Sequence, residues 1–227
     1  MHEFFLPQTQ PLFGNLLVLP QEGAQTGPTG RPPNSYALLL SGGRSVLFDA
    51  PYRRLLPALR QLAEEGYPPA ALVLSHYHVA GQADAFEAFT GEEFDVPVFL
   101  HPADAKQVPG AGVAFADPTE SAFLGEAGLE VVRAPFHTEG SVMLYAERHG
   151  GVLLAGDGAA APGPKQGLEP PRLERPPVGS EAKDREQRQF WKDFAERPLR
   201  SFLSLHGATY TGHDDLPEIM RPLWEAE

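Results

Sequence analysis

Six histidine and aspartate side chains follow short apolar runs along this chain, and this pattern constrains the fold more than any other feature. Each lies at or directly after a stretch that is typical of a buried strand; in chain order they are Asp49, His76, His78, His137, Asp157 and His206. Strands of one sheet present their ends side by side, so polar residues at several strand ends can converge on one rim. Imidazole and carboxylate groups are common metal ligands in proteins. We therefore expect a strand-rich fold with a metal site at one sheet edge.

Apolar runs and helical periodicity alternate in both halves of the chain. The runs predict strands over 13–19, 35–40, 45–49, 71–74, 96–100, 129–134, 141–147, 151–154 and 202–205. The helical periodicity predicts helices over 53–65, 82–89, 180–196 and 216–221. This interleaving favours two packed sheets with helices outside them, and we interpret residues 1–227 as a single domain. The Pro-rich segment 158–179 is interpreted as a connection within that domain, in which Lys165, Arg172 and Arg175 are candidates for contacting substrate.

The composition excludes several kinds of site and partner. There is no cysteine, so disulfides, thiolate ligands and cysteine nucleophiles are excluded and any metal must be held by His, Asp, Glu or backbone oxygen. The net charge of -12 opposes binding to a polyanion, and we expect no nucleic-acid partner. No apolar run approaches the roughly 20 residues that span a bilayer, and no secretory signal is recognisable. We expect no membrane partner and a cytoplasmic location.

The order of the motifs resembles the metallo-beta-lactamase superfamily. The matching motifs are Ser75-His76-Tyr77-His78, His137-Thr138-Glu139-Gly140-Ser141, Gly156-Asp157 and His206-Gly207, preceded by the hairpin motifs Asn34-Ser35-Tyr36 and Val46-Leu47-Phe48-Asp49. They extend from about residue 13 to 210 and follow the order of the superfamily's own motifs. The resemblance implies an α+β fold, a four-layer αββα sandwich with its metal site along one edge, and a place in the glyoxalase II-like hydrolase branch.

The resemblance also implies roles for the individual residues. His76, His78 and His137 would hold the first metal ion. Asp157 would bridge two metals, act as a fourth ligand or orient water as a base, and His206 would be a ligand at the second metal position or a polar residue of the pocket wall. Asp49 is expected in the second shell, where it accepts a hydrogen bond from a ligand imidazole and fixes its tautomer.

The chain departs from the superfamily signature, Thr-His-x-His-x-Asp-His, at one place. Ala80 and Gly81 stand where the family carries the Asp-His pair of the second metal position. Two deletion alignments of Val79–Gln82 stay open: one removes the pair, and the other puts Tyr77 and His78 in its place. We favour the alignments that keep both histidines at the first position, because the first of them follows its strand at the expected point. Every alignment loses the acidic ligand, so we expect one divalent ion, zinc first and iron or manganese as alternatives.

The expected chemistry is hydrolysis of a small ester, thioester or amide by a metal-activated water, because a bound divalent ion lowers the pKa of water toward about 7. Three histidines and Asp157 in a closed tetrahedron would be typical of structural zinc, so catalysis needs a loosely bound Asp157 or a five-coordinate ion. Two alternatives stay open. One is a mononuclear iron sulfur dioxygenase, and the other is a ligand-binding member of the fold without turnover. The sequence does not indicate the oligomeric state.

Overall fold

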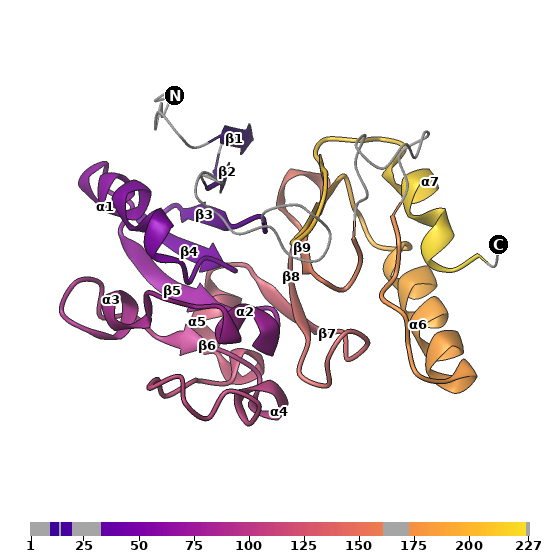
Figure 1. The fold of residues 1–227 in the computed structure, drawn as a ribbon. Helices are drawn as coiled ribbons and strands as arrows, with labels where there is room; N and C mark the ends of the chain where they lie inside the picture. The colour runs from indigo at the N-terminus through magenta and orange to yellow at the C-terminus, as the bar shows by residue number, and fades with distance from the viewer. Residues whose placement is uncertain (1–9, 14, 20–32, 161–172, 226–227) are drawn as a thin grey trace. The chain divides into compact units, whose positions relative to one another are not determined.

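The structure is a computed structural model, and it describes residues 10–13, 15–19, 33–160 and 173–225. The chain forms two compact units, unit 1 (Met1–Glu120) and unit 2 (Ser121–Glu227). Each unit contains one sheet with helices beside it (Figure 1). The expectation that residues 1–227 form a single domain stays a prediction. Among the described residues, no helix has both the length and the apolar character needed to cross a membrane.

The sheet of unit 1 has six strands in sequence order, β1 to β6. Its strands are β1 (Gln10–Phe13), β2 (Leu16–Val18), β3 (Tyr36–Leu40), β4 (Arg44–Phe48), β5 (Pro69–Val73) and β6 (Val98–Phe99). The first four form an antiparallel meander, whereas β4, β5 and β6 run parallel. The parallel strands therefore end at one edge of the sheet, which we call the carboxyl edge of unit 1.

The helices of unit 1 follow from short periodic segments and turns. They are η1 (Arg53–Leu55), α1 (Leu56–Glu64), α2 (Tyr77–Gly81), α3 (Phe86–Thr90), α4 (Pro102–Ala105) and η2 (Pro118–Glu120). The expected helix over 53–65 is confirmed as η1 and α1, with Pro57 in the first turn and buried Leu59 and Leu62 on one face. A proline is tolerated there because the first-turn amides have no intrahelical acceptor.

The helix predicted over 82–89 is wrong in its position. The chain is helical earlier, in α2, and again from Phe86 to Thr90 in α3, with a break between them. At the break the Asp84 amide donates to Pro51 O (3.2 Å), and the Asp84 carboxylate accepts from the Arg53 amide (2.6 Å). These hydrogen bonds connect the break between α2 and α3 to the start of η1. Local periodicity in the sequence does not reveal such long-range contacts.

The sheet of unit 2 has five strands in the order β11-β10-β9-β8-β7. They are β7 (Glu130–Arg133), β8 (Val142–Ala146), β9 (Val152–Gly156), β10 (Ser201–Ser204) and β11 (Thr209–Tyr210). Strands β9 and β10 are parallel, and β7 runs in the same direction as β9 because both are antiparallel to β8. The ends of β7, β9 and β10 therefore share the carboxyl edge of unit 2.

The helices of unit 2 among the described residues are α5 (Ala122–Glu126), η3 (Arg148–Gly150), α6 (Glu181–Phe194), α7 (Leu216–Met220) and η5 (Arg221–Leu223). Ser180 begins α6 as predicted, because its hydroxyl accepts from the Lys183 amide. The aromatic side chains of Trp191 and Phe194 pack with Phe202 of β10 in the buried core of this unit.

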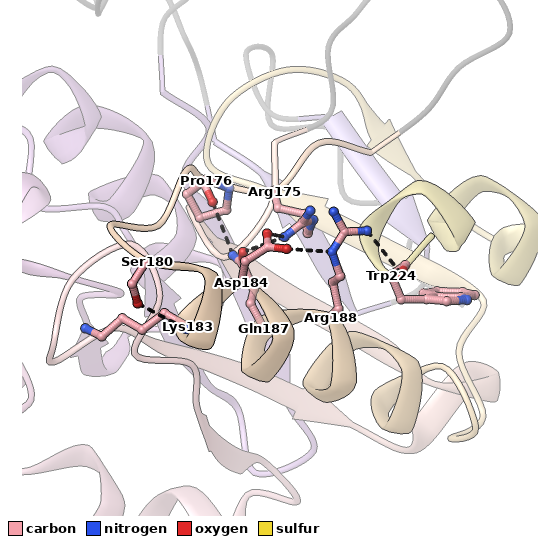
Figure 2. A network of polar contacts seen from close by, with 8 residues as sticks. All are labelled: Arg175, Pro176, Ser180, Lys183, Asp184, Gln187, Arg188 and Trp224. Atoms are coloured by element: carbon pink, nitrogen blue, oxygen red, sulfur yellow. Dashed lines mark hydrogen bonds and ion pairs between the residues drawn. The ribbon is translucent and has the colours of Figure 1, made fainter. Parts of the chain in front are cut away.

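A polar network on α6 holds the segment that follows residue 172 (Figure 2). Arg175 donates to Asp184 Oδ1 (2.5 Å) and to Gln187 Oε1 (3.0 Å), and Arg188 donates to Asp184 Oδ2 (2.7 Å) and Trp224 O (3.4 Å). Arg175 was a candidate for contacting substrate, but its guanidinium is engaged in this network. The other two candidates in this segment, Lys165 and Arg172, lie outside the described residues.

Candidate metal centre

His76 lies directly beyond the end of β5, the central parallel strand of unit 1. The strand has a parallel neighbour on each side, and Ala71, Leu72 and Val73 are fully buried, so both of its faces are covered. His76 itself is only 1% exposed, and Ser75 Oγ lies 2.9 Å from its Nδ1. The hydroxyl of Ser75 holds the orientation of the ring, with Nδ1 facing the hydroxyl and Nε2 as the candidate ligand atom. The sequence did not assign this role to Ser75.

His78 lies in the first turn of α2 and is exposed, unlike His76. The centres of the two imidazole rings are 5.0 Å apart, with an angle of 87° between the ring planes. Two imidazoles that share a tetrahedral zinc at the usual Zn–N distance have ring centres about 5 Å apart. The pair in unit 1 therefore fits a shared metal ion. Ala80 and Gly81 close α2, and neither carries a ligand atom.

Asp49 lies just beyond β4 and is fully buried. Its backbone has a φ of 53°, a left-handed conformation that is uncommon for a residue with a side chain. Its carboxylate Oδ1 accepts the Ser75 amide (2.7 Å), and its carbonyl accepts the Ser35 hydroxyl (2.5 Å). Asp49 thus holds the residue that contacts His76. Its expected hydrogen bond to a ligand imidazole stays a prediction.

A second buried carboxylate, Asp104, also reaches this turn. It lies on α4 just after β6 and is 1% exposed, and its Oδ2 accepts the Tyr77 amide (2.9 Å). Sequence reasoning missed Asp104. The available signal was its position: it follows the third parallel strand of the sheet, at the edge where Asp49 and His76 follow the other two.

In unit 2, two histidines lie near one carboxylate oxygen. Asp157 directly follows β9, and its Oδ2 is 3.7 Å from Nε2 of His137 and 3.7 Å from Nε2 of His206. Both separations are too long for a hydrogen bond. They are close to the distance of about 3.4 Å between two ligand atoms of a tetrahedral zinc. The carboxyl edge of unit 2 thus brings together the three residues that the sequence placed after β7, β9 and β10.

His137 lies in the turn between β7 and β8, and the hydroxyls of its motif shape that turn. Ser141 Oγ accepts the Thr138 amide (3.0 Å) and lies 2.7 Å from Thr138 Oγ1. The Ala134 amide donates to Ser141 O (3.0 Å), which closes the turn around the histidine. The side chain of His137 is 25% exposed. The hydroxyls of this motif therefore shape the turn that carries His137.

His206 lies two residues beyond β10, and its side chain is 21% exposed. Its Nδ1 is buried and has no hydrogen-bond partner among the residues that the structure describes. A buried ring nitrogen without a partner is costly unless water or a ligand satisfies it. Neither alternative for His206, metal ligand or polar residue of the pocket wall, is tested by this contact.

No family model and no curated protein matches the sequence. Solved structures do match. The DIM-1 metallo-beta-lactamase is 14% identical, with 95% of each chain covered and a TM-score of 0.66. The BLEG-1 B3 metallo-beta-lactamase is 20% identical, with 91% of this chain and 99% of that chain covered and a TM-score of 0.58. The flavodiiron core Flv1 from Synechocystis is 15% identical, with 94% and 59% covered and a TM-score of 0.60.

The similarity to these structures covers 91 to 95% of this chain. The two mixed sheets, each with helices, are the α+β architecture that the sequence predicted. From these similarities, the chain has the metallo-beta-lactamase fold.

Proposed function

We propose that the protein is a metal-dependent hydrolase that holds one divalent ion on His76, His78 and His137. The observation that carries the proposal is the 5.0 Å separation of the imidazole ring centres of His76 and His78, because it is close to the separation of about 5 Å expected for two ligands of one zinc. The placement of His137 beside Asp157 in unit 2 supports the third ligand. Zinc is the first expectation, with iron or manganese as alternatives.

The side chains of this proposal have distinct tasks. Ser75 holds Nδ1 of His76, so that Nε2 is the ligand atom, and Asp49 holds the Ser75 amide. Asp157 serves as a fourth ligand or orients the attacking water as a base. When bound, the ion supplies Lewis acidity and lowers the pKa of a coordinated water. A loosely held Asp157 keeps a coordination position open for catalysis.

The proposed substrate is a small ester, thioester or amide, as in the glyoxalase II-like branch that the sequence resembles. The fold neighbours that carry the name metallo-beta-lactamase support a hydrolase on this fold. A cytoplasmic location and the absence of nucleic-acid and membrane partners remain part of the proposal, in line with the net charge of -12.

Elemental analysis of protein purified without added metal tests the proposal, together with hydrolysis of a panel of small esters, thioesters and amides. We expect about one zinc per chain, and we expect His137→Ala to lose both metal and turnover. His213→Ala is the matched control, because His213 is a 42% exposed histidine of the same unit that contacts Asp215. The proposal fails if no metal is found above background and His137→Ala keeps the activity of the unmodified chain.

One alternative is a mononuclear iron sulfur dioxygenase. It is supported by the similarity to the Flv1 flavodiiron core, whose name indicates an iron protein. A mononuclear iron sulfur dioxygenase would contain stoichiometric iron and would consume oxygen with a persulfide substrate. Stoichiometric zinc with ester turnover would exclude it. A ligand-binding member of the fold without turnover would show neither activity.

A further inference from the structure

The backbone amides on both sides of His76 donate to buried carboxylates. The Ser75 amide donates to Asp49 (2.7 Å), and the Tyr77 amide donates to Asp104 (2.9 Å). Both aspartates are at most 1% exposed. Burying a carboxylate is costly unless hydrogen bonds compensate, so these two contacts constrain where the turn can lie.

The sheet explains how two distant aspartates reach one turn. Strand β5 lies between β4 and β6, and all three are parallel. Asp49 follows β4, Asp104 lies in the helix α4 after β6, and His76 follows β5 between them. The carboxylates therefore approach the turn from opposite sides of β5.

The contact to Asp104 also bears on how the N-terminus of α2 is capped, because His76 occupies the residue before this helix. The first amides of a helix have no intrahelical acceptor, and the side chain of the residue before the helix commonly caps them. His76 occupies that position, with extended backbone, and its side chain makes no capping hydrogen bond. Asp104 accepts the first amide of α2 from another part of the sheet. The imidazole of His76 is thus not required as a cap and can be oriented for metal binding.

We propose that Asp104 is a positioning residue of the metal site: its contact to the Tyr77 amide fixes the first turn of α2, and with it the relative orientation of His76 and His78. This inference rests on the metal binding proposed above. Asp104 acts through the backbone and is not itself a ligand. Its loss should therefore weaken metal binding by changing geometry rather than by removing a donor atom.

The test compares substitutions of Asp104 in the full chain, with zinc affinity from chelator competition and the visible spectrum after loading with cobalt(II). Asp104→Ala removes the acceptor of the Tyr77 amide and should lower zinc affinity by about 10- to 100-fold, which is typical for the loss of a residue that positions a metal ligand. It should also alter the visible spectrum of the cobalt(II) protein. Asp104→Asn keeps an acceptor oxygen and should restore affinity to within about threefold of the unmodified chain.

Asp117→Ala is the matched control, because Asp117 is an aspartate of the same unit whose Oδ1 accepts a backbone amide at the same 2.9 Å, from Thr119. It should leave affinity and spectrum unchanged. Circular dichroism of the metal-free proteins checks folding. If Asp104→Ala does not fold, Asp104→Glu replaces it in the test. This variant displaces the acceptor by one methylene and should lower zinc affinity by the same factor.

The inference is overturned if the folded Ala or Glu variant binds zinc with unchanged affinity and spectrum, or if Asn loses as much affinity as Ala, which would indicate a role of charge. Failure of the proposed function is a different result, since the unmodified chain itself would then bind no metal.

Discussion

The two carboxyl edges present their candidate metal ligands in different ways. In unit 1 the ligand candidates lie in one turn, where His76 is 1% exposed and the amides beside it donate to Asp49 and Asp104. In unit 2 they come from three strands, and His137, Asp157 and His206 have exposed fractions of 25%, 16% and 21%. The comparison indicates that the first edge is prearranged by backbone contacts, whereas the second depends on the placement of its strands.

The placement of β9 in unit 2 gives the largest expected effect. Gly151 precedes β9 with a φ of +97°, and a Cβ there would lie 1.8 Å from Pro198 O. Gly151→Ala should therefore destabilise the protein by about 4 kcal/mol or more, measured by urea denaturation. Gly42→Ala in unit 1 is the control, because no heavy atom beyond the glycine and its two chain neighbours lies within 4 Å of its Cβ position. This variant should change stability by at most about 0.5 kcal/mol. Equal stability of the two variants would contradict the importance of this close approach.

Replacing one histidine at each edge sharpens the comparison. His76→Ala should lower the stability of the metal-free protein by about 1 to 2 kcal/mol, because the ring is buried and contacts Ser75. His137→Ala should change it by no more than about 0.5 kcal/mol, since its side chain is partly exposed. Thermal unfolding of the metal-free proteins measures both. If the two variants lose the same stability, the edges do not differ in the way described.

A smaller effect is expected at the hydroxyl of Ser75. Ser75→Ala removes the group 2.9 Å from His76 Nδ1 and should lower zinc affinity by about tenfold, near the lower end of the range for an outer-shell contact. Ser75→Thr keeps a hydroxyl, and threonine stands at this place in the superfamily signature, so it should retain affinity. Chelator competition measures both variants. A Thr variant as weak as Ala would argue that side-chain volume, not the hydroxyl, matters here.

The smallest effect concerns the network on α6 in unit 2 (Figure 2). Hydrogen bonds from Arg188 and Arg175 lower the pKa of Asp184 below its ordinary value of 3.8. The folded-state pKa is thus below the unfolded one, so the stabilisation is present above about pH 4 and is lost as the pH falls through the folded-state pKa. Asp184→Asn should flatten the loss of stability below pH 4 without changing zinc affinity. Denaturation curves from pH 2 to 7 test this; an unchanged acid slope would contradict it.

Much of the strand framework could be predicted from the sequence. The buried runs Ala71–Val73 and Val152–Leu154 lie in β5 and β9, because strands that are covered on both faces of a sheet need continuous apolar side chains. The helix over 82–89 could not be placed, because its start depends on contacts of Asp84 with residues more than 30 positions away in the chain. Asp104 was missed because its contact with the Tyr77 amide joins residues 27 positions apart in the chain.

The sequence by itself determined which residue types stand at the strand ends: histidine and aspartate without cysteine, in an order that resembles one superfamily. It also determined that Ala80 and Gly81, which follow the two histidines, carry no ligand atoms. Only the tertiary structure decided which groups hold His76, because Asp49 and Asp104 reach its turn through parallel pairing of strands that are distant in the chain. Strand pairing is set by burial and long-range hydrogen bonds, and local sequence patterns do not encode those partners.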